Sequence, residues 1–228
     1  MQTEIKYRPA YALAVVTLAP NEGIRVDAGA MVSMSPDVQI ETKAQGGILA
    51  SLGRSLLGGE SFFQNSFRAS AKGGEITLAP PLPGDMFTIE MKGETLLLQS
   101  GAYVGSSESI TLDTKWTGAK TFFASEGLIM LRASGTGTLV FSSYGAIHEK
   151  NLAAGEKYKV DTGHIVAFSD GMGFQVQRIG GVKSTFFSGE GLIVELTGPG
   201  RLLMQTRSED AFLAWLIPHL PKPSSSNR

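Results

Sequence analysis

A twelve-residue pattern occurs three times in this chain and constrains its fold more than any other feature. The copies begin at Asn21, Gly93 and Gly155, and each has a glutamate in second place and a glycine in ninth place. Recurrence of one pattern along a chain indicates a structure built from similar units. It also suggests that polar residues present in every copy belong to the scaffold.

The copies have the alternation typical of β-strands. Ile24 and Val26 are separated by one polar residue in the first copy, and the other copies keep this spacing. A period of two indicates a strand with one buried face. The ninth-place glycines, Gly29, Gly101 and Gly163, are expected at a bulge, a bend or a close backbone approach.

A second pattern follows each first one and centres on an acid beside glycine and large apolar residues. The acids are Glu60, Glu126 and Glu190. A glycine turn and another alternating strand then close each unit. The units cover about residues 1–79, 80–142 and 143–207. We therefore predict one all-β domain over residues 1–207, a β-sandwich or barrel-like fold with pseudo-threefold internal repeats.

Two segments depart from this pattern. The first, residues 46–59, is a predicted helical insertion with Arg54 opposite an apolar side formed by Ile48, Leu49, Leu52, Leu56 and Leu57. Such a side packs on its own core, on a protein partner or on a membrane. The second, residues 208–220, is a predicted helix with a Ser208 cap, expected to pack on the β domain. Trp215 is its interaction candidate, and residues 221–228 are expected to form a flexible tail.

The bulk composition excludes several classes of function. The chain has 228 residues, a net charge of −1 and no cysteine, so nucleic-acid binding and thiolate chemistry are not expected. No cofactor motif is present. The first residues do not show the basic stretch and apolar core of a signal peptide, so none is expected, and no apolar run approaches the roughly 18 residues of a membrane span. We expect a cytoplasmic protein.

The three repeated acids are the first candidates for a ligand site. A threefold axis would bring Glu60, Glu126 and Glu190 together, where they could bind a cation or share protons. The competing interpretation is that each carboxylate accepts backbone N–H groups at its own corner. The second interpretation is favoured, because a corner repeated in every unit is typical of scaffold.

His164 is the other candidate, because the first two copies have Ala30 and Ala102 in its place. The three histidines lack metal-ligand spacing, and no nucleophile motif accompanies them. A partly buried, hydrogen-bonded histidine is favoured over a catalytic one. We therefore expect no enzymatic activity.

At these residues the chain resembles the bacterial and archaeal homologues of the fungal altered-inheritance-of-mitochondria protein with the mitochondrial-biogenesis name. That family is placed in the tryptophan RNA-binding attenuation protein-like superfamily. The resemblance covers essentially the full chain, through residues 59–63 (GESFF), 99–103 (QSGAY), 114–120 (TKWTGAK), 125–128 (SEGL), 160–167 (VDTGHIVA), 188–192 (SGEGL), 198–201 (GPGR) and 205–207 (QTR). It implies an all-β fold with threefold similarity and no established catalytic residues. Residues for tryptophan or RNA binding do not match here.

Two functions remain open from the sequence. The first is a non-catalytic β scaffold acting through a protein partner or homo-oligomer. The alternative is a small-ligand or metal-binding protein, or an enzyme, with a polar site near the pseudo-threefold axis. Peripheral membrane contact through residues 48–57 is a weaker third possibility, because Arg54 is the segment's lone cation.

Overall fold

The structure of the chain is a computed structural model. It describes residues 1–41, 64–113, 129–178 and 192–221. The candidate acids Glu60, Glu126 and Glu190 lie outside the described residues. So do the apolar candidates of the insertion, Ile48, Leu49, Leu52, Leu56 and Leu57.

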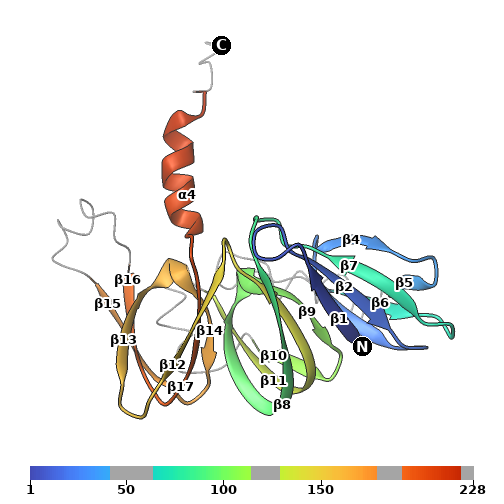
Figure 1. Ribbon diagram of the computed structural model, residues 1–228, viewed down its shortest axis with the longest axis horizontal. Helices are drawn as coiled ribbons and strands as arrows, with labels where there is room; N and C mark the ends of the chain where they lie inside the picture. The colour runs from blue at the N-terminus through green and yellow to red at the C-terminus, as the bar shows by residue number, and fades with distance from the viewer. Residues whose placement is uncertain (42–63, 114–128, 179–191, 222–228) are drawn as a thin grey trace, which may run out of the picture.

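Most of the described chain is β-strand, and the all-β prediction is confirmed (Figure 1). The first unit contains β1 (Gln2–Lys6), β2 (Leu13–Leu18), β3 (Gly23–Asp27), β4 (Met31–Met34), β5 (Val38–Glu41), β6 (Gln64–Ala69) and β7 (Gly74–Leu78). The second contains β8 (Met86–Gln99), the 3₁₀ turn η1 (Ser100–Ala102), β9 (Tyr103–Ser107), β10 (Ile110–Asp113) and β11 (Met130–Ser142). The third contains β12 (Ile147–Leu152), β13 (Lys157–Asp161), η2 (Thr162–His164), β14 (Ile165–Ser169), β15 (Gly173–Arg178), β16 (Leu192–Thr197) and β17 (Gly200–Gln205). The chain then forms α4 (Glu209–Leu216) and η3 (Ile217–His219).

One large sheet runs through all three units. Within the described chain its order is β12-β17-β14-β8-β11-β9-β3-β6-β5, with β10 also paired to β11. Smaller sheets, β1-β2-β7-β4 and β13-β16-β15, complete the two ends of the molecule. The named strands pair antiparallel, and the layered arrangement is sandwich-like.

The buried side chains form three apolar clusters, one for each unit. Phe67 and Ile76 lie in the first cluster, Leu131 and Phe141 in the second, and Phe168 in the third. Each cluster also takes residues from a neighbouring unit. The first includes Val104 and Val140, the second Val166 and Leu203, and the third Leu97 and Met130. The units therefore bury their apolar faces together rather than independently.

The first residue of each twelve-residue copy has a left-handed backbone, beside a turn in the first and third copies and at an irregularity within β8 in the second. Asn21, Gly93 and Gly155 have φ values of 60°, 105° and 76°. Left-handed backbone of this kind favours glycine and tolerates asparagine. The choice of residue at this place is therefore a backbone requirement.

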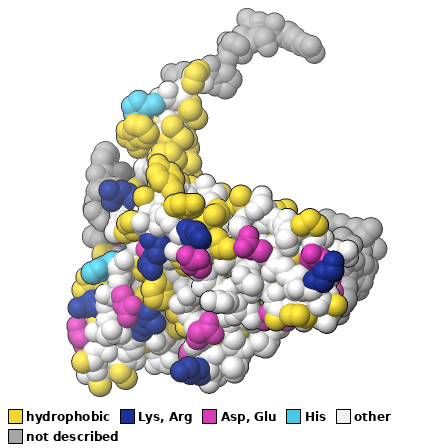
Figure 2. All heavy atoms as spheres, turned by 45° about the vertical axis from the view of Figure 1, so that its right-hand side comes forward, with side chains coloured by type: hydrophobic (Ala, Val, Ile, Leu, Met, Phe, Trp, Pro, Cys, Tyr) yellow, Lys and Arg dark blue, Asp and Glu magenta, His cyan; other side chains and the backbone are white. Residues whose placement is uncertain are grey.

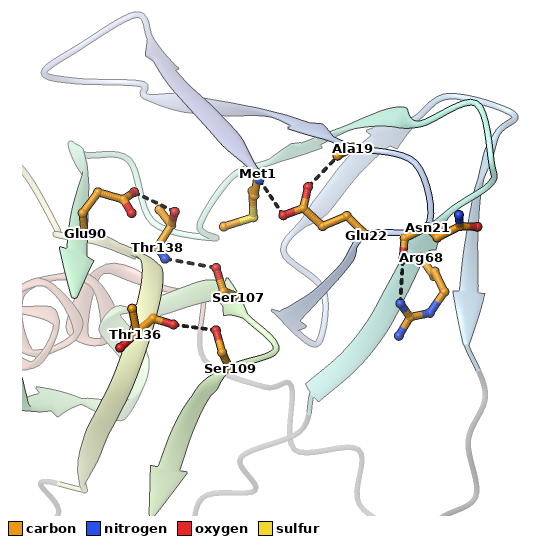
Figure 3. A network of polar contacts seen from close by, with 10 residues as sticks. All are labelled: Met1, Ala19, Asn21, Glu22, Arg68, Glu90, Ser107, Ser109, Thr136 and Thr138. Carbon is orange, nitrogen blue, oxygen red and sulfur yellow. Dashed lines mark hydrogen bonds and ion pairs between the residues drawn. The ribbon is translucent and has the colours of Figure 1, made fainter. Parts of the chain in front are cut away.

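The glutamates that follow accept backbone N–H groups in all three units. Glu22 accepts from Ala19 at 2.8 Å, Glu94 from Lys92 at 2.7 Å and Glu156 from Ala153 at 2.9 Å. Figure 3 shows that the Met1 ammonium also meets the Glu22 carboxylate. These backbone hydrogen bonds lower the pKa of Glu94 and of Glu156. These repeated acids are part of the scaffold.

The C-terminal helix does not pack along the β domain as the sequence analysis expects. None of its residues is buried, and Figure 1 shows it projecting from the body. The helix contacts the body at its first turn, where the ring of Phe212 packs edge-to-face on the ring of Tyr144, with 6.0 Å between the ring centroids. No helix among the described residues has the length and apolar character needed to cross a membrane.

The second and third units begin side by side. Gly84 and Gly145 form a parallel bridge, and Asp85 N–H donates to the Gly145 carbonyl at 2.8 Å. A Cβ at Gly84 would lie 1.8 Å from the carbonyl oxygen of Ser143, which is backbone and cannot rotate away. This crossing therefore requires glycine.

We expect Gly84→Ala to lower the free energy of unfolding by about 3 kcal/mol, because the added methyl group forces the two backbones apart. Urea unfolding followed by fluorescence measures the loss. Gly101→Ala is the matched control, because a Cβ there meets nothing within 4 Å. Equal stability of the two variants would show that the crossing can relax.

Candidate functional site

A cavity of about 530 Å³ lies between three segments, one from each unit, that surround the ninth-place glycines of the twelve-residue copies. We call these segments the three corners. The first unit contributes Asp27 and Ala30, from the turn between β3 and β4. The second contributes residues 99 and 101–104, around η1, and the third contributes residues 162 and 163, in η2. Segments far apart in the sequence thus form one cavity, whereas the acids predicted for a shared polar site lie outside the described residues.

The rest of the wall comes from the segments that surround these corners. The linker before the second unit supplies Pro80, Pro81 and Leu82, and the end of β11 supplies residues 142–144. The end of β17 supplies Gln205. The start of the C-terminal helix supplies residues 208–210 and Leu213. The helix therefore rises from the rim of the cavity.

Gln205 fixes the third corner. Its side-chain oxygen accepts from Tyr144 N–H at 2.9 Å, and its side-chain nitrogen donates to the Gly163 carbonyl at 2.8 Å. Gln205 is buried, so these bonds replace water that the amide would otherwise bind. The side chain shapes the wall, and both of its polar atoms already have partners.

His164 is half-buried and hydrogen-bonded, as the sequence analysis expects. Its Nδ1 lies 2.7 Å from the carbonyl oxygen of Gln205. A carbonyl only accepts, so Nδ1 carries the proton. The alanines that replace this histidine in the other units, Ala30 and Ala102, are buried and line the cavity. The imidazole is used to hold the end of β17.

The charged residues of the described lining are all acidic. They are Asp27, Glu209 and Asp210, and no described Lys, Arg or His lines the cavity. Among the described residues, no group of three or more His, Cys, Asp or Glu is arranged to hold a metal ion. The cavity therefore has a negative potential without a metal-binding geometry.

Asp27 is the chemically unusual member of this group. It is half-buried at the end of β3 and forms no ion pair with any described residue. Burial, opposed by a hydrogen bond from the Ala28 backbone, raises the pKa of Asp27 to about 6. The equivalent residue of the third unit, Asp161, accepts from Gly163 N–H at 2.8 Å and caps its own turn.

Sequence reasoning missed Asp27 because its place is polar in every copy. The seventh residue is Asp27, Gln99 or Asp161, so treating repeated polar residues as scaffold sets all three aside. The available signal was the residue type, because only Asp27 and Asp161 are charged. Trp215, the described interaction candidate, is 62% exposed on the projecting helix and lies outside the cavity lining.

Residues 3–207 match the family described as mitochondrial biogenesis AIM24. The chain belongs to this family. An uncharacterised protein of Streptococcus pyogenes serotype M6 is 26% identical over 223 residues, covering 94% of this chain and 89% of the relative. The crystal structure of a protein from Streptococcus pyogenes matches with a TM-score of 0.80 and 25% identity, covering 96% of this chain and 99% of that one. The AIM24 match confirms the resemblance given by the sequence motifs.

We expect Asp27→Asn to stabilise this AIM24-family chain at neutral and alkaline pH. The folded-state pKa of about 6 exceeds the ordinary value of 3.8, so ionisation of Asp27 costs folding free energy as the pH rises. Because Asp27 is partly exposed, we expect the variant to gain only about 1 kcal/mol in free energy of unfolding at pH values above the folded-state pKa. Calorimetric unfolding of both proteins at about pH 8 measures this difference.

Below the ordinary pKa of 3.8 both states carry a neutral Asp27, so the advantage of the asparagine should vanish. Glu209→Gln is the control, because this acid lines the same cavity from an exposed position. A stability difference between wild type and Asp27→Asn that does not change with pH would contradict the burial of this carboxylate.

Proposed function

We propose that this AIM24-family chain is a non-catalytic β scaffold that acts through protein contacts, and that α4 mediates self-association. The observation that carries the proposal is the exposed apolar surface of the helix. Leu213 is 39% exposed, Trp215 62%, Ile217 60% and Leu220 51%. Figure 2 shows this segment as a column of apolar side chains extending from the body.

The helix has a well-formed beginning. Ser208 accepts from Ala211 N–H at 3.4 Å, and Glu209 and Asp210 occupy the first turn, where the helix dipole favours negative charge. Beyond this turn, Phe212 stacks on Trp215 with 6.3 Å between the ring centroids, and the rings of Trp215 and His219 have centroids 5.2 Å apart. The apolar surface is therefore an ordered row of rings.

A helix that is apolar on all sides is normally buried. Short helices are also only marginally stable in water, because the free energy lost in nucleating a helix exceeds the free energy gained from a few turns of hydrogen bonds. α4 and η3 together run from Glu209 to His219, which is shorter than the length at which isolated helices become stable. A partner that covers the distal part supplies the missing burial.

The charge pattern favours a second copy as that partner. Acids occupy the first turn of α4, and His219 occupies the last turn of η3. In an antiparallel pair, Asp210 lies beside His219 of the partner subunit, and the two helix dipoles oppose each other favourably. Residues 208–221 contain no Lys or Arg, so attraction to anionic lipid has little basis there.

The support for a non-catalytic role is chemical. His164 and His219 both direct Nδ1 at a backbone carbonyl, of Gln205 and Trp215 respectively. A catalytic histidine typically also contacts a nucleophile that it activates. Among the described residues, no serine, threonine or lysine is hydrogen bonded to either ring.

We expect wild type to form a dimer of about micromolar affinity, because two short helices bury less than a standard interface. Replacing Trp215 and Ile217 together with serine removes the two most exposed apolar side chains of this surface and should give a monomer of about 24.2 kDa. Size-exclusion chromatography with light scattering at about 100 µM measures the mass.

Ile40→Ser is the matched control for this experiment, because Ile40 is 45% exposed on β5 and far from the helix in the sequence. It should leave the dimer intact. A monomeric wild type at this concentration, or a dimer that survives loss of Trp215 and Ile217, overturns self-association through α4.

A further inference from the structure

We propose that the cavity between the three corners binds a small organic amine, with the ammonium group paired to Asp27 and the apolar body against Pro80, Pro81 and Leu213. The inference can be tested separately from self-association, because Trp215 and Ile217 are not part of the cavity lining, although Leu213 belongs both to the lining and to the exposed apolar surface of the helix. It assigns a ligand class to a cavity that the scaffold itself does not require.

Asp27 differs from the other buried or repeated acids of this chain. Asp85, which is 4% exposed, receives Nε and Nη2 of Arg8 at 2.8 and 2.9 Å. Glu22 pairs with the Met1 ammonium, and Glu156 pairs with Lys150 at 3.5 Å, whereas Asp27 accepts a hydrogen bond from the Ala28 backbone. Asp27 is half-buried without such an ion pair among the described residues, so its negative charge is left for a group that enters from outside.

The sign of the ligand's charge follows from the charged residues that line the cavity. Asp27 lies in one corner, and Glu209 and Asp210 lie at the base of the helix. With no described cation among the lining residues, an anionic ligand would meet only repulsion from charged groups. A cation is attracted from both sides, and an ammonium group supplies three donors for carboxylate and hydroxyl acceptors.

The ligand's size and body follow from the remaining walls. A volume of about 530 Å³ falls in the range of small-molecule sites. Pro80, Pro81, Leu82 and Leu213 give apolar surface, so a bare metal ion would leave much of the space unused. The described acids also lack a metal-binding arrangement. An organic cation satisfies both the charged and the apolar parts.

Small residues keep the cavity open. Ala30 and Ala102 are buried in its wall, and a Cβ at Gly101 would meet nothing within 4 Å. Gly101 lines the cavity from an exposed position, and its φ lies outside the left-handed region, so the backbone tolerates a larger side chain there. This position allows the cavity to be narrowed while every acid is retained.

The test is calorimetric titration of the full-length protein with benzylamine, using benzyl alcohol and benzoate as uncharged and anionic probes. Near neutral pH we expect benzylamine to bind with a dissociation constant of about 0.1–1 mM, and the other probes at least about tenfold more weakly. Asp27→Asn should weaken benzylamine binding at least about tenfold, and Gly101→Leu should weaken it as well by narrowing the cavity.

Ile40→Ser serves as the unaffected control, and thermal unfolding of each variant shows that it remains folded. Equal benzylamine affinity in wild type and Asp27→Asn overturns the proposal, as does tighter binding of benzoate or no benzylamine binding at all. A monomeric protein that still binds benzylamine through Asp27 would refute only the self-association, so the two proposals fail separately.

Discussion

The pairing of β8 on both of its edges is the constraint on which the rest of the molecule depends. This strand runs from Met86 to Gln99 and pairs with β11 along nearly its whole length. Its C-terminal end also pairs with β14, where Leu97 lies opposite Phe168. Strand β8 of the second unit is thus paired directly with the third unit and is connected to the first unit through β11 and β9. Because β8 ends at the cavity wall, its register also sets where the three corners meet.

Local features of this architecture could be predicted from the sequence. The alternation of Ile24 and Val26 predicts strand β3, and both side chains are buried. Asn21, Gly93 and Gly155, the first residues of the three copies, have the left-handed backbone conformation that their residue types favour or tolerate. These predictions succeed because periodicity and backbone preference act over a few residues. The pseudo-threefold relation between whole units stays a prediction.

The site could be predicted only in part, because it depends on contacts between distant segments. A shared polar site among the units was expected, but the acids chosen for it lie outside the described residues. Asp27 was set aside because Asp161 has the same place in its repeat, although the two carboxylates have different surroundings. The helix predicted at residues 208–220 is present, yet an apolar helix surface does not specify whether it covers its own domain or another chain.

The position of the C-terminal helix has a thermodynamic consequence. Its first half contributes to the cavity wall, through residues 208–210 and Leu213, while Trp215 and Ile217 are exposed. Because a molecule in the proposed site would contact the base of the helix, we expect it to change the energy of holding the helix at its present angle. A ligand and an assembly partner that both depend on this angle are linked reciprocally, so that each alters the affinity for the other by the same factor. The contact of Phe212 with Tyr144, whose ring centroids lie 6.0 Å apart, is the place where this coupling would act on the helix.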